Sequence, residues 1–330
     1  MATKDSLGDR MKGYYEEISK TKLTRRTPVI ARLDGKAFHT FTRGFEKPFD
    51  NILVESMQET MKYLCENVQG CVLGYTQSDE ITLVLVDYQT LESSAWFDYE
   101  VQKMTSILAS MATLAFNRIF NKKATAWING ECNDPKRFKQ DEDTFYHIND
   151  LIGTYEKAIN KGAMFDARVF NIPKEEVTNC VFWRQLDAER NSILSVAQAN
   201  FSHKEMQGIS CKNLVTKLEE EKGIIWGNLP TTLKRGSCCV KKREYILPDG
   251  QRVKNRSIID YDGHSGVFYE DGDGYYLYYS EGSKDTLDLS NLKSIKIDVK
   301  ESSKWVIDNN IPCFKGEGRD YIEDLINVGE

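Results

Sequence analysis

The chain has 330 residues, of which 40% are hydrophobic and 28% are charged, and its formal net charge is −6. This is the composition of a globular protein, and no apolar run approaches the ~20 residues that a membrane-spanning helix needs. The polar N-terminal residues 1–20 do not resemble a signal peptide. The negative net charge argues against a protein that coats nucleic acid, although an enzyme with a local basic groove remains compatible with it. We expect a cytoplasmic globular protein that does not bind membranes.

The eight cysteines have no C-x-x-C spacing, and several of them lie in apolar runs. Scattered cysteines of this kind are typical of reduced thiols in a cytosolic protein. The four histidines are scattered as well, so a zinc site is not expected.

Hydrophobic periodicity divides the first half of the chain into alternating strands and helices. Pro48 and Asp50 mark the start of the first helix, with Asp50 as the expected N-cap. Gln77-Ser78-Asp79 forms the turn of a hairpin between the second and third strands. The predicted elements are, in order, a strand at 28–33, a helix at 53–68, strands at 71–76 and 80–87, a helix at about 94–120, and a strand at 165–170.

The order β-α-β-β-α-β predicts an α+β protein with a ferredoxin-like core, the arrangement of the palm in polymerases and nucleotide cyclases. In this topology the first strand lies beside the third. Asp34 follows the first strand and Asp79 precedes the third. We therefore expect these two carboxylates to meet at one end of the sheet.

The remaining segments predict additions to this core. A polar, lysine-rich insertion with local helix is expected near 121–162, outside the core, and residues 174–220 look mainly helical. Residues 1–240 form the expected palm-like catalytic domain, and residues 241–330 form a β-rich extension packed on it. That extension is rich in tyrosine, with Asp-Gly turns predicted at 249–250, 262–263, 271–272 and 273–274.

Asp34 and Asp79 are candidate ligands for two magnesium ions, which prefer oxygen ligands and keep several waters. Gly35 allows a close backbone approach, so its carbonyl oxygen can be a further ligand. For either aspartate alone, an ordinary turn residue is the simpler reading. Their expected meeting at matching strand ends favours a two-metal site for a nucleoside triphosphate.

Several other side chains have the chemistry to contact phosphates. Ser78 and His39 lie close in sequence to the two aspartates, and Lys47 precedes the first long helix. Lys103 lies on the second one. Any of them can neutralise or hydrogen-bond triphosphate oxygens. Each can equally be an ordinary surface or packing residue.

Five strings, RLDGKAFHTF, FEKPFD, GYTQSDEITLVL, FDARVFNIP and VFWRQLDAERNS, resemble the tRNA-His guanylyltransferase family. They occur in the family's order and cover roughly residues 28–240. The resemblance implies nucleotide addition to RNA 5′ ends in the 3′→5′ direction, with a polymerase-like palm and two Mg²⁺ ions. ATP or GTP would be substrates, and a homotetramer is the implied assembly.

The resemblance also implies roles for matching residues. Asp34, Gly35 and Asp79 would bind the metals, and Asp34 and Asp79 would be catalytic. Lys222 would act in activation of the 5′ end, with Lys217 as the competing candidate. The implied nucleotide-binding residues are Asp34, Gly35, Lys36, Ala37, Phe38, His39, Lys47, Ser78, Asp79, Lys103 and Asn191.

Two departures narrow this expectation. Eukaryotic members carry His-Ile-Asn-Asn where this chain has Glu189-Arg190-Asn191-Ser192, and Glu100 replaces a basic residue of their triphosphate pocket. The chain therefore resembles the bacterial and archaeal-type guanylyltransferase-like branch, which repairs tRNA with a recessed, 5′-truncated end by template-dependent addition. Guanosine addition to histidine tRNA remains an alternative. A nucleotide cyclase and a non-catalytic nucleotide- or RNA-binding protein remain alternatives of other classes.

Overall fold

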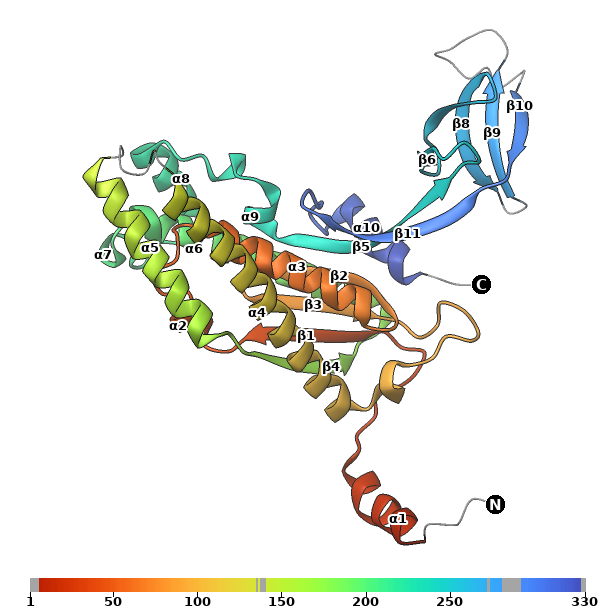
Figure 1. Ribbon diagram of the computed structural model, residues 1–330, viewed down its shortest axis with the longest axis horizontal. Coiled ribbons are helices and arrows are strands. Elements are labelled where there is room, and N and C mark those ends of the chain that lie inside the picture. The colour runs from red at the N-terminus through yellow and green to blue at the C-terminus, as the bar shows by residue number, and fades with distance from the viewer. Residues whose placement is uncertain (1–5, 135, 137–140, 272–273, 281–291, 328–330) are drawn as a thin grey trace. The chain divides into compact units, whose positions relative to one another are not determined.

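We analysed a computed structural model, which describes residues 6–134, 136, 141–271, 274–280 and 292–327 (Figure 1). The chain forms two compact units. Unit 1 contains residues 1–240 and 307–330, and unit 2 contains residues 241–306. Residues 307–330, which the sequence analysis assigned to the C-terminal extension, thus belong to unit 1.

The centre of unit 1 is an antiparallel β-sheet in an α+β arrangement. Strand β1 lies between β3 and β4, and β2 pairs with β3, so the order is β2-β3-β1-β4. The predicted adjacency of the first and third strands is confirmed. The strands across the sheet are β11 (Lys300–Asp308), β5 (Ser237–Ile246), β2 (Cys71–Gln77), β3 (Glu80–Leu85), β1 (Val29–Gly35) and β4 (Phe165–Asn171).

Two long helices cover one face of this sheet: α3 (Asn51–Asn67) against β2, and α4 (Val101–Asn133) against β4 (Figure 1). Asp50 caps α3 by accepting a hydrogen bond from the Leu53 amide, which confirms the predicted N-cap. On the opposite face, α6 (Lys174–Asn200) and α10 (Asp320–Ile326) bury an apolar cluster. Ile311, Phe314 and Ile322 belong to that cluster, which is why the C-terminal segment returns to unit 1.

The segment between α4 and β4 differs from its prediction. Helix α4 continues to Asn133, and α5 (Glu142–Lys161) packs beside it. Tyr155 of α5 is buried, and the centre of its ring lies 5.3 Å from the ring centre of Phe45 and 6.1 Å from that of Phe120. The expectation that this segment lies outside the core is wrong, because its aromatic face closes a cluster of phenylalanines that follows β1.

The other helical elements have between 3 and 12 residues. They are α1 (Ser6–Met11), the π-helix η1 (Lys12–Glu16), the 3₁₀ helices η2 (Glu17–Ser19), η3 (Trp96–Tyr99), η5 (Trp226–Asn228) and η7 (Gly316–Arg319), and the α-helices α2 (Phe38–Phe41), α7 (His203–Met206), α8 (Cys211–Lys222) and α9 (Thr231–Arg235).

Unit 2 is built from β-hairpins around a small apolar core. Four strands form an antiparallel sheet in the order β10-β9-β8-β7, which buries Phe268 and Leu277. The predicted Asp-Gly turns at 271–272 and 273–274 each include a residue outside the described part of the chain. The strands are β6 (Arg252–Val253), which pairs with β5, β7 (Ile258–Tyr261), β8 (His264–Asp271), β9 (Gly274–Ser280) and β10 (Leu292–Ile297).

All eight cysteines are free thiols, of which four are buried and Cys132 is exposed. In the described part of the chain, no helix combines the length and apolar character needed to span a bilayer.

The buried aromatic cluster predicts a large stability effect. Phe120 is fully buried and contacts Phe41, Phe45 and Phe116. We expect Phe120→Ala to lower the free energy of unfolding by about 3–5 kcal/mol, because it leaves a cavity between α4 and α5. Chemical denaturation measures this change. Leu114→Ala, at an exposed position on the same helix, is the matched control and should change stability little. Equal effects of the two substitutions would contradict the packing described here.

Candidate active site

A row of carboxylates crosses one end of the central sheet. Asp34 of β1 lies opposite Glu80 of β3 and Asp166 of β4. Asp79 lies in the hairpin turn beside them, and its carbonyl oxygen accepts a 3.1 Å hydrogen bond from the Gly35 amide. The expected meeting of Asp34 and Asp79 is therefore confirmed.

The backbone turns sharply just after Asp34. A Cβ atom on Gly35 would lie 2.2 Å from the Phe38 ring, so only glycine fits. Ala37 follows with a left-handed backbone (φ 53°), and Phe38 packs on Phe116 and Phe165. Ser78 in the facing turn also has a positive φ, of 49°. Two non-glycine residues in this conformation on either side of the carboxylates are typical of a functional site.

Both aspartates carry negative charge that the protein compensates poorly. Burial, together with repulsion from Glu80 and Asp166, raises the pKa of Asp34 against the opposing effect of Arg168 and Arg32. Burial likewise raises the pKa of Asp79, and repulsion from Asp34 adds to it, although a hydrogen bond from Ser78 opposes the shift. A cation between the two carboxylates would relieve this repulsion.

Three arginines lie near the row, and they mainly bind the outer carboxylates. Arg168 lies 3.0 Å from Asp166 but 4.0 Å from Asp34. Arg184 of α6 is buried and binds Glu80, and Arg32 lies 3.5 Å from the same carboxylate. Sequence reasoning did not assign a role to either arginine of the Glu80 pair. The only signal for Arg184 was its position in the VFWRQ string.

The donor set fits magnesium. Among the described residues, no cluster of three or more histidine, cysteine, aspartate or glutamate side chains is arranged to hold a metal ion. Magnesium does not require such a cage, because it usually binds one or two carboxylates and completes its shell with water and substrate phosphate. Asp34 and Asp79, poorly compensated and adjacent, provide such a pair.

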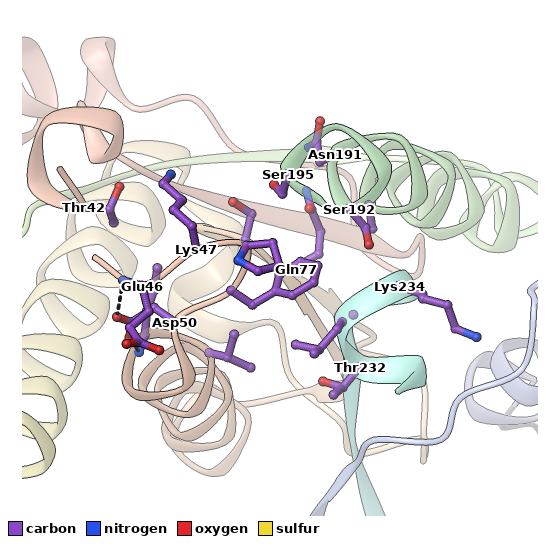
Figure 2. Close-up of a pocket in the computed structure, with 18 of the residues that line it drawn as sticks. Thr42, Glu46, Lys47, Asp50, Gln77, Asn191, Ser192, Ser195, Thr232 and Lys234 are labelled. Carbon is purple, nitrogen blue, oxygen red and sulfur yellow. Dashed lines mark hydrogen bonds between the residues drawn. The ribbon is translucent and has the colours of Figure 1, made fainter. Parts of the chain in front are cut away.

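A cavity of about 200 Å³ opens beside the hairpin turn (Figure 2). Figure 2 shows Lys47 on one side and Asn191 of α6 on the other, so two predicted nucleotide-binding residues face the same space. Ser78 also lines it and connects it with the carboxylate row. The polar residues of the lining are Thr42, Glu46, Lys47, Asp50, Gln77, Ser78, Asn191, Ser192, Ser195, Thr232 and Lys234.

Asp50 is a fixed part of the cavity wall. Its carboxylate accepts hydrogen bonds from the Glu46 amide (3.2 Å), the Leu53 amide (2.9 Å) and the Tyr155 hydroxyl (2.6 Å). Sequence reasoning identified Asp50 only as a helix cap, and the contribution of α6 and α9 to the cavity was not predicted apart from Asn191. These residues come from segments far apart in sequence, so no local pattern could have revealed them.

The predicted loop 34–39 is divided between the core and the surface. Phe38 is buried among aromatic rings, so its side chain does not face a ligand. Lys36 and His39 are exposed, and the Lys36 amide donates to the Met164 carbonyl.

Two predicted lysines lie away from the carboxylates. The Phe165 amide at the start of β4 donates a hydrogen bond to the Thr113 hydroxyl of α4, and Lys103 lies ten residues earlier on that helix, about 15 Å away along its axis. Lys222 ends α8, where its amine lies over the Phe201 ring, outside the cavity lining. Lys217 contacts the same ring and donates to the Glu205 carbonyl.

Comparison with known proteins identifies the family. The family model described as Thg1, tRNAHis guanylyltransferase, matches residues 8–173. The chain belongs to the tRNAHis guanylyltransferase family. Members of this family are nucleotidyltransferases, and this chain is therefore an enzyme of that class.

Several relatives match this chain over most of its length. The uncharacterized protein R259 of Acanthamoeba polyphaga mimivirus is 30% identical over 77% of this chain and 82% of its own. A bacterial tRNA(His) guanylyltransferase-like protein solved in complex with ATP is 32% identical, with a TM-score of 0.66 over 98% of this chain and 100% of that one. A corresponding structure in complex with GTP gives 31% identity and a TM-score of 0.61 over the same shares.

The raised pKa values in this guanylyltransferase-family protein predict a pH-dependent stability effect. A carboxyl group whose pKa is higher in the folded than in the unfolded state stabilises the folded state while it is protonated. This stabilisation is lost as the pH rises from the pKa of the unfolded state through the pKa of the folded state. In the absence of divalent cations, we expect Asp79→Asn to raise the melting temperature near pH 8 and to have little effect near pH 4. Thermal unfolding with a chelator measures this difference.

Adding Mg²⁺ should stabilise the wild type near pH 8 but not Asp79→Asn. Asp150→Asn, at an exposed position on α5, is the control and should behave like the wild type. A melting temperature that Asp79→Asn lowers at pH 8 without cations would contradict the electrostatic description.

Proposed function

We propose that this enzyme adds nucleotides in the 3′→5′ direction to the recessed 5′ end of a tRNA, with the opposing strand as template. The observation that carries this proposal is the meeting of Asp34 and Asp79 beside a polar cavity, in a chain of this family. Base pairing with the opposing strand would select each nucleotide, so the protein needs only to hold the triphosphate and the RNA end.

We further propose that β2-β3-β1-β4 with α3 and α4 acts as a ferredoxin-like polymerase palm. The antiparallel order of these strands and the site at the Asp34 end of β1 support this assignment. The other face of the sheet, where α6 packs, carries Asp34 and Glu80.

The cavity supports binding of ATP or GTP, the nucleotides bound by the bacterial relative. Lys47 supplies positive charge for the triphosphate, and Ser78 and Asn191 supply hydrogen bonds. Asp34, Asp79 and the Gly35 carbonyl would hold two magnesium ions, which lower the pKa of the attacking hydroxyl and neutralise phosphate charge. The raised pKa values of both aspartates support this role.

The reaction has two chemical steps. A 5′-monophosphate end attacks the α-phosphorus of ATP or GTP, which releases pyrophosphate and leaves a nucleotidylated 5′ end. The 3′-hydroxyl oxygen of an incoming nucleotide then attacks the 5′ phosphorus, and the activating nucleoside monophosphate leaves. A 5′-triphosphate end would skip the first step and release pyrophosphate in the second. We assign Lys222 to the activation step on its resemblance alone.

The segment 189–192 favours repair over guanosine addition to histidine tRNA. Asn191 and Ser192 line the cavity, Glu189 binds Arg235 at 2.7 Å, and the Ser192 hydroxyl accepts a 3.0 Å hydrogen bond from the Trp226 indole. This segment is therefore part of the cavity wall, and its sequence departs from the His-Ile-Asn-Asn of eukaryotic members.

The decisive experiment uses tRNAs that lack the first 5′ nucleotide, with each labelled nucleoside triphosphate and Mg²⁺. We expect addition of the nucleotide that pairs with the opposing base, whichever base that is. Addition of guanosine alone, to intact histidine tRNA, would favour the alternative activity. A cyclic nucleotide formed without RNA would identify a cyclase, and binding without any product would identify a non-catalytic protein.

Substitution of the paired aspartates tests the site. We expect Asp34→Asn or Asp79→Asn to lower nucleotide addition at least about 100-fold, because several kcal/mol of transition-state stabilisation would be lost. Asp166→Asn removes a carboxylate of the same row that already pairs with Arg168, and it should retain most activity. An active Asp79→Asn enzyme would contradict the proposal.

Lys103 gives a test of the proposed homotetramer. Because Lys103 is about 15 Å along α4 from the Asp34 end of the sheet, it can serve that site only when another copy of the chain carries it there. We expect Lys103→Ala and Asp79→Asn each to be inactive alone but to recover partial activity when the unfolded chains are mixed and refolded together. Unmixed refolded samples are the control, and no recovery would assign Lys103 a role outside the site.

A further inference from the structure

We propose that Trp183, together with Arg32 and Arg184, forms a surface on which a nucleobase of the RNA 5′ end stacks. The surface lies on α6 next to the carboxylate row and outside the cavity described above. The choice of RNA as the ligand rests on the proposed function.

Trp183 has an unusual environment for a tryptophan. Trp183 is 52% exposed, whereas the next two residues of α6, Arg184 and Gln185, are buried. Tryptophan is on average a highly buried residue, and a large exposed aromatic ring beside a reaction site is more informative than an isolated surface leucine. The indole thus has ring surface left to offer a ligand.

Two guanidinium groups pack against the indole ring system of Trp183. The Arg184 Cζ lies 4.5 Å and the Arg32 Cζ 5.1 Å from the centre of a Trp183 ring. Both arginines also bind Glu80, so neither is free to swing away. A ring held this way is presented in one orientation, which reduces the entropy lost when a planar ligand stacks on it.

The surface is close to the proposed chemistry. Arg32 and Asp34 are two residues apart on β1 and point to the same face of the sheet, so their Cα atoms are about 7 Å apart. A base stacked on Trp183 would therefore place its own phosphate near Asp34. The cavity remains available for the nucleoside triphosphate, so the RNA end and the triphosphate have separate places.

The charges around Trp183 favour a nucleic acid over an apolar protein partner. Arg168, opposite Arg32 in the sheet, is 53% exposed in its side chain and pairs with Asp166 at 3.0 Å, and Arg190, two helical turns along α6, is 63% exposed and pairs with Asp187 at 2.5 Å. Exposed guanidiniums that flank an aromatic ring can contact backbone phosphates while the ring stacks on a base. This combination is typical of surfaces that bind unpaired nucleotides.

The test compares RNA binding by three variants in the absence of nucleoside triphosphates. The probe is a tRNA lacking its first 5′ nucleotide, and binding is followed by electrophoretic mobility shift. We expect Trp183→Ala to raise the dissociation constant about 10-fold or more, since base stacking on an aromatic side chain contributes about 1–3 kcal/mol. Trp183→Phe should stay within about 3-fold of the wild type. Tyr146→Ala, an exposed aromatic residue on α5, is the matched control and should not change binding.

Fluorescence provides a readout that a structural role would not produce. RNA should quench the tryptophan emission of the wild type, and this quenching should be lost in Trp183→Phe because the stacked indole is gone, while the other four tryptophans keep the emission measurable. ATP affinity should be unchanged in all variants. Unaltered RNA affinity in Trp183→Ala, or quenching that persists in Trp183→Phe, would overturn the inference. So would a changed oligomeric state of Trp183→Ala in size-exclusion chromatography, since Trp183 would then be a subunit contact.

The outcomes separate this inference from the proposed function. Binding that depends on Trp183 in a protein that never extends RNA would refute only the proposed reaction. Extension with unchanged RNA affinity in Trp183→Ala would refute only the stacking surface.

Discussion

The site depends on electrostatic repulsion within the carboxylate row at one end of the central sheet. Strand register brings Asp34, Glu80 and Asp166 side by side, and the hairpin turn adds Asp79. Burial, together with this concentration of like charge, raises the pKa values of Asp34 and Asp79. The arginines neutralise only part of this negative charge, because they bind mainly Glu80 and Asp166. The remaining negative charge would attract a divalent cation to this end of the sheet.

The packing around the row keeps these charges in place. Gly35 and Phe38 fix the turn after β1, and Phe38 is itself held by the rings of α4 and β4. On the other face, Arg184 is buried in α6 while binding Glu80. The geometry of the site is therefore set by the core on one side and by a buried ion pair on the other, rather than by the exposed loops.

Local patterns predicted the strands, the hairpin and the cap of α3, because each depends on residues near one another in sequence. The same reasoning brought Asp34 and Asp79 together through the strand order. It could not predict that α5 is part of the core, since Tyr155 meets Asp50 across 105 residues. Nor could it find the pairing of Arg184 with Glu80 across 104 residues. Family resemblance indicated Lys103 as a residue of the site, but not that its own chain holds it away from the aspartates.

The carboxylate of Asp50 connects three parts of the molecule that have different roles. It caps α3, lines the cavity and accepts a hydrogen bond from Tyr155 of α5. A change in α5 that moved Tyr155 would therefore reshape the cavity wall without altering any residue that touches a ligand. The shape of the cavity can thus diverge through remote substitutions in α5, and comparisons restricted to cavity-lining residues would overlook them.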